Sequence, residues 1–89
     1  MTHYFIDTDD GNFSALDEEG HDLPDASAAR RLALRALSDM VADTLSDGDR
    51  RVLTVRVREA DGEPVYAAEL ALSGEWLREP SGRADGGTL

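Results

Sequence analysis

The clearest pattern in the chain is an alternation of apolar and polar residues after its middle. From residue 52 to 58, valine and leucine alternate with threonine and arginine. Because successive side chains of a strand point to opposite sides of a sheet, the alternation predicts a strand with one buried face. The pair Asp61-Gly62 is typical of a tight hairpin turn. The strand that follows, up to Leu72, should therefore pair antiparallel with the first.

The apolar positions set the register of this hairpin, since a slip of one residue would turn every side chain to the wrong face. With Asp61 and Gly62 at the tip, Pro64 lies opposite Glu59, where its missing N–H is not needed. On the outer face Arg56 lies diagonal to Glu69. The apolar residues are predicted to pair as Val57 with Tyr66, Val55 with Ala68, and Leu53 with Leu70.

The first seventeen residues predict a second hairpin. Residues 3–7 include aromatic and β-branched side chains, which favour a strand. Asp10-Gly11 is again a turn signal, and with that pair at the tip Thr8 lies opposite Phe13. The two strands would then place Tyr4, Ile6, Phe13 and Ala15 on one face of the sheet, and Phe5 and Leu16 on the other.

An alanine-rich segment between the hairpins predicts one long helix. Asp25 can cap its start by accepting the backbone N–H of Ala28, and Gly48 is a typical stop. We therefore expect a helix from Ala26 to Ser46. Its apolar stripe is predicted to consist of Ala26, Ala29, Ala33, Ala36, Leu37, Met40, Val41 and Thr44, flanked by Leu32, Leu34 and Leu45.

Together these elements predict an α+β domain of the order ββαββ. A four-stranded antiparallel sheet would carry the long helix on one face, and residues 21–23 could add a short edge strand. A chain of 89 residues holds one domain, which we place at residues 1–77. Residues 78–89 are rich in Gly, Ser, Pro and charge and predict a flexible tail. No apolar run approaches the roughly 20 residues of a membrane span, so a cytoplasmic protein is expected.

Charge narrows the possible partners. The chain has 19 acidic and 9 basic residues and a net charge of −10. This balance argues against direct binding to nucleic acid, because phosphate contacts need a basic face. Residues 1–29 contain eight acidic residues and neither lysine nor arginine. This acidic first third could serve solubility, or it could meet a basic partner protein.

The residue types that carry chemistry give no catalytic signature. The chain has no cysteine, which excludes disulfides, thiolate metal sites and a cysteine nucleophile. His3 and His21 lack the spacing of a metal-binding pair, and Gly11 comes one position early for a calcium loop that starts at Asp7. The serines have no nucleophile-elbow context. We therefore expect no enzyme, no metal and no cofactor.

One helix covers only one face of a sheet, so the other face should stay open. It mixes apolar and polar side chains and is too apolar for a simply solvated surface. The segment around Trp76 could fold back over it, two copies of the chain could pair through it, or a different protein could bind it. The candidate interaction residues are Phe5, Leu16, Val52, Thr54, Arg56, Val65, Glu69 and Trp76.

The charges of the predicted helix oppose its own dipole. Arginines occupy its first half and aspartates its second, whereas a helix dipole favours the reverse. This order indicates that the arginines face the acidic loops before the helix. The alternative is a small-ligand or anion-binding site built from Arg30, Arg31 and Arg35.

Several short motifs stand out along the chain: Tyr4-Phe5-Ile6, Asp10-Gly11, Asp17-Glu18-Glu19-Gly20, Leu23-Pro24-Asp25, Ala29 with Ala33, and Asp61-Gly62. Together they resemble a small bacterial family of unknown function, common in rhizobia and related alphaproteobacteria, and the resemblance covers roughly residues 3–72. This resemblance implies no activity, ligand or catalytic residue. A weaker similarity to HicB-like antitoxins implies an acidic, non-catalytic domain that neutralises a small basic toxin.

Overall fold

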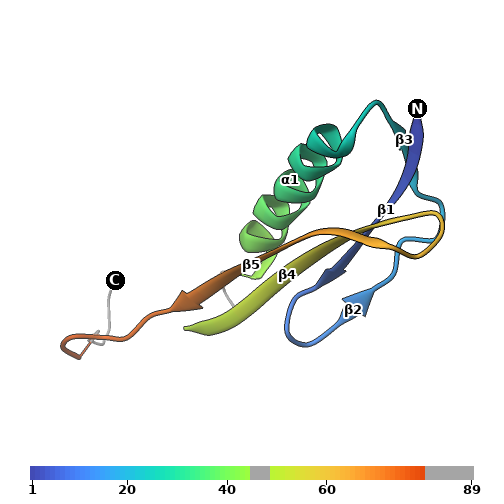
Figure 1. Ribbon diagram of the computed structural model, residues 1–89. Helices are drawn as coiled ribbons and strands as arrows, with labels where there is room; N and C mark the ends of the chain where they lie inside the picture. Colours follow the sequence, from blue (N-terminus) through green and yellow to red (C-terminus); the bar gives the residue numbers. More distant parts are fainter. Residues whose placement is uncertain (45–48, 80–89) are drawn as a thin grey trace.

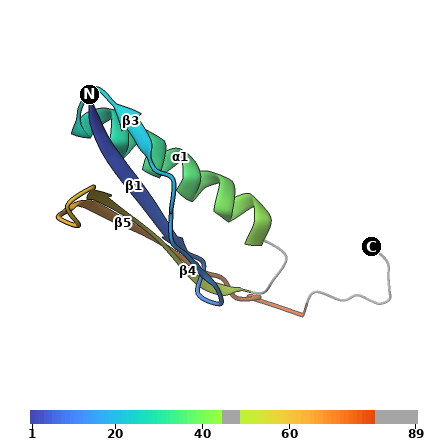
Figure 2. The same cartoon turned by 90° about the vertical axis from the view of Figure 1, so that its right-hand side faces the viewer.

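An antiparallel sheet with one helix on one of its faces makes up the fold (Figures 1 and 2). The computed structural model describes residues 1–44 and 49–79. The last residues of the predicted helix, 45–46, and residues 80–89 of the predicted tail lie outside the described residues. The architecture confirms the α+β class predicted from the hydrophobic pattern.

Five strands form the sheet, in the order β2-β1-β4-β5, and β3 also pairs with β1. β1 and β4 lie at its centre, where Ile6 pairs with Val57. β3 pairs with residues 2–4 of β1, which confirms the short edge strand, and β2 pairs with residues 8–9. The strands are β1 Thr2–Asp9, β2 Ser14–Ala15, β3 His21–Leu23, β4 Arg50–Glu59 and β5 Pro64–Ser73.

The hairpin of β4 and β5 has the predicted register over most of its length: Leu53 pairs with Leu70 and Val57 with Tyr66. Next to the turn a β-bulge shifts the pairing, so that Pro64 lies opposite Arg58 and not opposite Glu59. The bulge adds one residue, Val65, whose side chain packs against the core. Val65 therefore does not belong to the open face on which the alternation had placed it.

The first hairpin is wider than predicted. Its register pairs Thr8 with Ala15, because residues 10–13 form the loop and Asp10-Gly11 alone does not. The Asp10 carboxylate accepts the backbone N–H groups of Asn12 and Phe13 at 2.9 and 2.8 Å, so these two donors of the longer loop have a partner. The shift is two residues, so Ser14 and Ala15 keep their predicted faces, whereas Phe13 lies in the loop and not in the strand.

The helix α1, Ala26–Thr44, begins as predicted: the Asp25 carboxylate accepts the N–H of Ala28 at 2.9 Å. Small side chains on its buried side bring it close to the sheet. Within the described residues, α1 lacks the apolar length needed to cross a membrane. The core consists of Tyr4, Ile6, Ala29, Ala33, Leu37, Leu53, Val55 and Val57.

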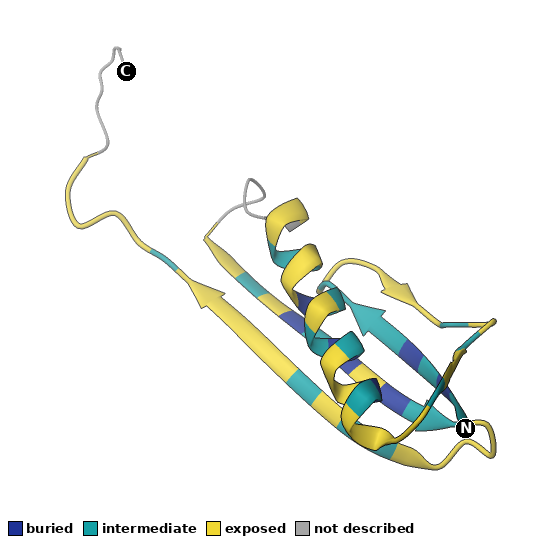
Figure 3. Ribbon diagram, turned by 90° about the horizontal axis from the view of Figure 1, so that it is seen from above, coloured by how far each residue is buried: buried dark blue, intermediate teal, exposed yellow. Residues whose placement is uncertain are grey.

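The helix crosses the sheet obliquely and leaves part of β5 bare. At its start, the Arg30 guanidinium lies 5.7 Å from the ring centre of Tyr66 on β5. Near its end, Met40 lines a hollow together with residues of the first hairpin. The second half of β5 is consequently exposed (Figure 3), and Leu70 and Leu72 keep 44% and 40% of their surface accessible.

Candidate functional site

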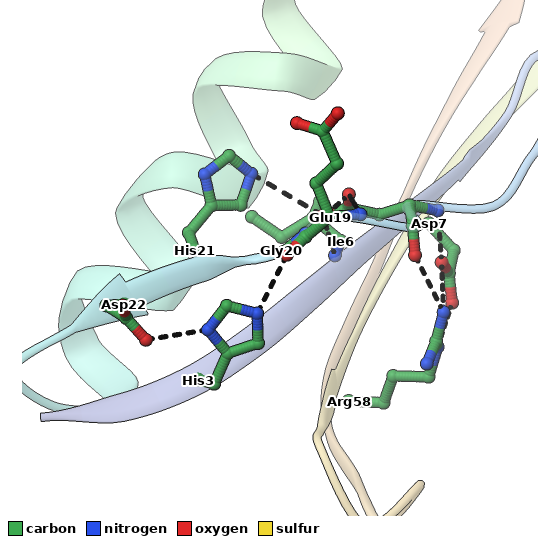
Figure 4. A network of polar contacts seen from close by, with 9 residues as sticks. His3, Ile6, Asp7, Glu19, Gly20, His21, Asp22 and Arg58 are labelled. Carbon is green, nitrogen blue, oxygen red and sulfur yellow. Dashed lines mark hydrogen bonds and ion pairs between the residues drawn. The ribbon is translucent and has the colours of Figure 1, made fainter.

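A polar cluster lies on the sheet face opposite the helix, the open face (Figure 4). Arg58 donates to both carboxylate oxygens of Asp7, at 2.8 and 3.2 Å, and to the backbone oxygen of Asp17 at 3.1 Å. Its guanidinium also lies 4.6 Å from the ring centre of Phe5, the residue directly opposite on β1. The aromatic ring that was expected to lie bare on this face is therefore covered by an arginine.

His3 extends the cluster. Its Nδ1 donates to the Asp22 carboxylate at 2.6 Å, its Nε2 donates to the backbone oxygen of Glu19 at 2.8 Å, and its ring meets Phe5 edge-on. Both partners are acceptors only, so the arrangement favours a ring with a proton on each nitrogen. The hydrogen bond to Asp22, and after it the one to Glu19, raises the pKa of His3.

Asp17 fills a gap in the sheet. β1 pairs with β3 before Ile6 and with β2 after it, and the Ile6 N–H donates to the Asp17 carboxylate at 3.0 Å. The same carboxylate accepts the N–H groups of Glu19 and Gly20, at 3.2 and 2.9 Å. Partial burial raises the pKa of Asp17, but these three hydrogen bonds outweigh it and leave the pKa below its ordinary value.

Asp7 is held in the same way. Partial burial raises its pKa, while the hydrogen bonds from Arg58 and from the Asp17 N–H lower it by more, so that the carboxylate stays ionised. The charged groups of the cluster are thus satisfied by one another. Within residues 1–44 and 49–79, no three His, Cys, Asp or Glu side chains gather as metal ligands would. The cluster ties the acidic turn to the sheet.

Two shallow hollows line the rest of the open face. One, of about 500 Å³, is bordered by Leu16, Thr54 and Arg56 beside the Asp7–Arg58 pair. The other, of about 320 Å³, is bordered by Thr54, Arg56 and Glu69. The structure therefore brings together four of the predicted interaction residues. In the described part of the chain, Arg56 forms no ion pair.

Trp76 does not cover this face. The N–H of Gly74 donates to the backbone oxygen of Asp49 at 2.7 Å, and the chain then continues outward beyond β5 (Figure 1). Trp76 keeps 70% of its surface exposed. The interpretation in which the Trp76 segment folds back over the sheet is therefore wrong, because the chain leaves the end of the β4–β5 hairpin without turning.

The apolar surface gathers at the far end of that hairpin. Val52 is exposed on the open face, while Leu70 and Leu72 are exposed on the helix side, and Trp76 follows. We call residues 50–53 and 70–77 the distal ribbon. The alternation predicted Leu70 on the inward face opposite Leu53, but Leu70 is exposed, because alternation identifies a face and not how far a helix covers it. Among the described residues, most of the large apolar side chains that are exposed lie in the distal ribbon.

The three helix arginines do not converge on one site. Arg30 lies over Tyr66 at the β5 side, Arg31 is exposed, and Arg35 borders a hollow at the opposite side of the helix. Asp17 and Asp39 border the same hollow. Arg35 thus faces the acidic turn, as the charge order of the helix indicated, and an anion there would meet two carboxylates.

Comparison with known proteins gives a family for the chain. Residues 3–71 match a family described as a domain of unknown function, DUF6894. Neither the rhizobial grouping nor the similarity to HicB-like antitoxins is part of that match. No curated protein and no solved structure matches the chain. Because the match includes the complete sheet core, the acidic turn and the helix, the chain belongs to the DUF6894 family.

Proposed function

We propose that this domain is a non-catalytic protein-interaction module that associates with a second copy of itself. The distal ribbon, together with Arg56 and Glu69 of the open face, forms the contact region. The observation that carries the proposal is the balance of exposed and buried apolar residues. Of the residues that the structure describes, eight form the core, two of them alanines. In the described ranges 1–44 and 49–79, seven large apolar side chains besides Met1 are exposed: Phe13, Leu16, Val52, Leu70, Leu72, Trp76 and Leu77.

The distribution of these side chains supports an interface. Single exposed apolar residues are normal, whereas neighbouring ones on a small domain are typical of binding surfaces. Leu70 and Leu72 lie on one side of β5, and Val52 lies on the other side of the neighbouring strand. Both sides of the same two strands are therefore exposed, as in a strand pair that is completed by another chain.

Charge favours a second copy over a basic partner. Among the residues of β5 only Glu69 is charged. The acidic first third is largely engaged within the chain, since six of its eight carboxylates accept internal hydrogen bonds. The distal ribbon therefore suits an apolar partner surface of similar kind.

Light scattering over a range of concentrations tests the proposal. We expect the mass to rise from 9.6 kDa towards twice that value. A mass that stays at the monomer value up to about 1 mM would contradict it, because a free energy of association of only about −4 kcal/mol would be visible there.

A pair of variants locates the contact. Leu70→Asp places a charge on the distal ribbon and should weaken association by about tenfold or more, because an unpaired charge would be buried. Leu16→Asp changes a side chain that is 72% exposed at the other end of the open face and should leave association unchanged. Both positions are exposed enough for the variants to fold, which circular dichroism checks. Loss of association in Leu16→Asp alone would instead place the contact over the larger open-face hollow.

A further inference from the structure

The two edges of the sheet are built differently. One edge consists of β2 and β3, with two and three residues, and the Asp17 carboxylate satisfies the free N–H between them. The other edge is β5, with ten residues, which among the described strands pairs only with β4. Proteins usually protect a long edge with lysines, prolines or inward charges. After its first residue, β5 contains one glutamate and no proline, lysine or arginine.

We infer that β5 pairs antiparallel with the β5 of a second copy, so that the two sheets join into one. This inference rests on the proposed self-association and names its geometry. A two-fold axis perpendicular to the sheet relates two antiparallel edge strands, and each contact then occurs twice. The axis keeps both helices on the same side of the joined sheet. The helix-side residues of one β5 therefore lie next to the helix-side residues of the other β5.

This symmetry leaves few registers. Opposed residues must lie on the same face, so the axis passes through a single residue position near the middle of β5. An axis at Glu69 opposes two carboxylates, which is destabilising. An axis at Leu70 places Glu69 of one copy opposite Ala71 of the other, beside the exposed apolar Val52. An axis at Ala68 avoids both of these unfavourable positions of Glu69.

The register centred on Ala68 gives the Glu69 carboxylate a cation. Ala67 of one copy then lies opposite Glu69 of the other, and Arg56 is the neighbour of Ala67 on β4. Arg56 and the second copy's Glu69 would be two strand spacings apart, about 9.6 Å between backbones, with only a methyl group between them. Two long side chains bridge that distance. Each dimer would contain two such ion pairs.

The same register covers the apolar surface that the helix leaves bare. Leu70 of one copy would lie opposite Tyr66 of the other, an aliphatic–aromatic cross-strand pair. Tyr66 lies at the start of the helix, under Arg30. Each helix would thus cover, in the second copy, the part of β5 that it leaves exposed in its own chain.

Cysteine cross-linking tests the register, and the chain has no cysteine of its own to interfere. Single variants Ala68→Cys, Glu69→Cys and Leu70→Cys are oxidised at a concentration where light scattering shows the dimer. Opposed side chains have Cβ atoms about 4.5–5.5 Å apart, close to the range that a disulfide needs. We expect Ala68→Cys to cross-link fastest, and Ala60→Cys in the turn to serve as an exposed control.

Each outcome decides between the two proposals. A dimer that cross-links fastest at residue 69 or 70 overturns the register, and a dimer that cross-links at none of the three overturns the β5 pairing while self-association stands. A protein that stays monomeric overturns both. Fastest cross-linking at residue 68 supports both.

Charge reversal supplies an independent readout. Arg56→Glu and Glu69→Arg should each weaken the dimer by about fivefold, as for the loss of exposed ion pairs of 0.2–1 kcal/mol each. The double variant should restore the wild-type association. Glu18→Arg, an exposed glutamate in the acidic turn far from β5 in the sheet order, is the matched control and should not weaken it. Melting temperatures of the variants show whether the monomer fold is intact, and a double variant as weak as the single ones would overturn the Arg56–Glu69 pairing.

Discussion

At the scale of single residues, the acidic side chains of the first third act as structural ligands for the backbone. Asp9 and Asp10 accept hydrogen bonds within the first loop, and Asp25 caps the helix. Asp17 accepts the N–H of Ile6 in the gap between β3 and β2. Carboxylates accept several hydrogen bonds at once, which suits them to a region of turns and short strands. The high acid content of this region thus follows from its need for acceptors, and the acidic turn at residues 17–20 is explained by folding.

Removing the Asp17 carboxylate should destabilise the fold markedly. Asp17→Ala leaves the N–H of Ile6 without its acceptor in a partly buried place, and hydrogen bonds to charged groups contribute about 1.5–3 kcal/mol each without adding fully. We expect a loss of about 2–3 kcal/mol in the free energy of unfolding, measured by urea denaturation. Glu18→Ala in the same turn is the control, and equal stability of the two variants would contradict this role.

His3 should make stability depend on pH in the neutral range. The folded state raises its pKa above the ordinary value of 6.5. The folded protein therefore binds the proton more tightly, so the contribution of His3 is complete below pH 6.5 and is lost as the pH rises through the higher folded pKa. Melting temperatures should fall over this range in the wild type and fall less in His3→Gln. Identical pH profiles of the two proteins would refute the role of this side chain.

Asp7 and Asp17 should act at the acidic end of the pH range. Their pKa values are lowered from 3.8, so their contribution is present above that pH and is lost as the pH falls through the folded values. Acid unfolding followed by circular dichroism should shift to higher pH in Arg58→Ala, because the Asp7 carboxylate loses the guanidinium that keeps it ionised. An unchanged acid midpoint would show that the ion pair does not lower the pKa.

At the scale of elements, the small residues of α1 set its distance from the sheet. Ala29 and Ala33 are fully buried between helix and strands. Ala33→Leu would push the helix outward and should cost about 1–3 kcal/mol, as overpacking of cores does. Ala42→Leu, at an exposed position of the same helix, should change stability by less than about 0.5 kcal/mol. Thermal unfolding measures both, and a tolerated Ala33→Leu would mean that the helix contact is loose.

Strands that follow from the local alternation of apolar and polar residues could be predicted from the sequence. Features that depend on contacts between segments far apart in the chain could not. The alternation around Val55 was sufficient for most of the β4–β5 register, because Leu53, Val55 and Val57 of β4 are all buried on one face. The bulge at Val65 and the wide loop at Asp10 depend on hydrogen bonds that the alternation does not report. The exposure of Leu70 depends on the path of the helix across the sheet, which no segment encodes by itself.

The candidate interaction residues likewise divide into those whose position follows from the local pattern and those whose position depends on long-range contacts. Leu16, Thr54, Arg56 and Glu69 border the open-face hollows, as their strand positions predicted. Phe5 shares their face but lies under Arg58, a contact that joins residues far apart in the chain. Arg30 and Arg35 are close in sequence yet point to different sides, because each residue of a helix turns by about 100° and five residues leave them roughly 140° apart.

At the scale of the whole molecule, one edge of the sheet is protected and the other is not. Short strands and satisfied backbone groups close the side of β2 and β3. β5 leaves a ten-residue edge and neighbouring apolar side chains open. The simplest way to cover such an edge is pairing with the same edge of a second copy, because one symmetric contact then buries both open edges.

Amide hydrogen exchange of β5, measured at low and high protein concentration, tests this pairing most directly. Every second amide of residues 66–72 points away from β4 and, in the dimer, would donate to the second copy. We predict that exchange at these alternate amides slows as the concentration rises, while exchange at β2 and β3 stays constant. Exchange along β5 that is independent of concentration, in a protein that light scattering shows to be a dimer, would contradict the pairing.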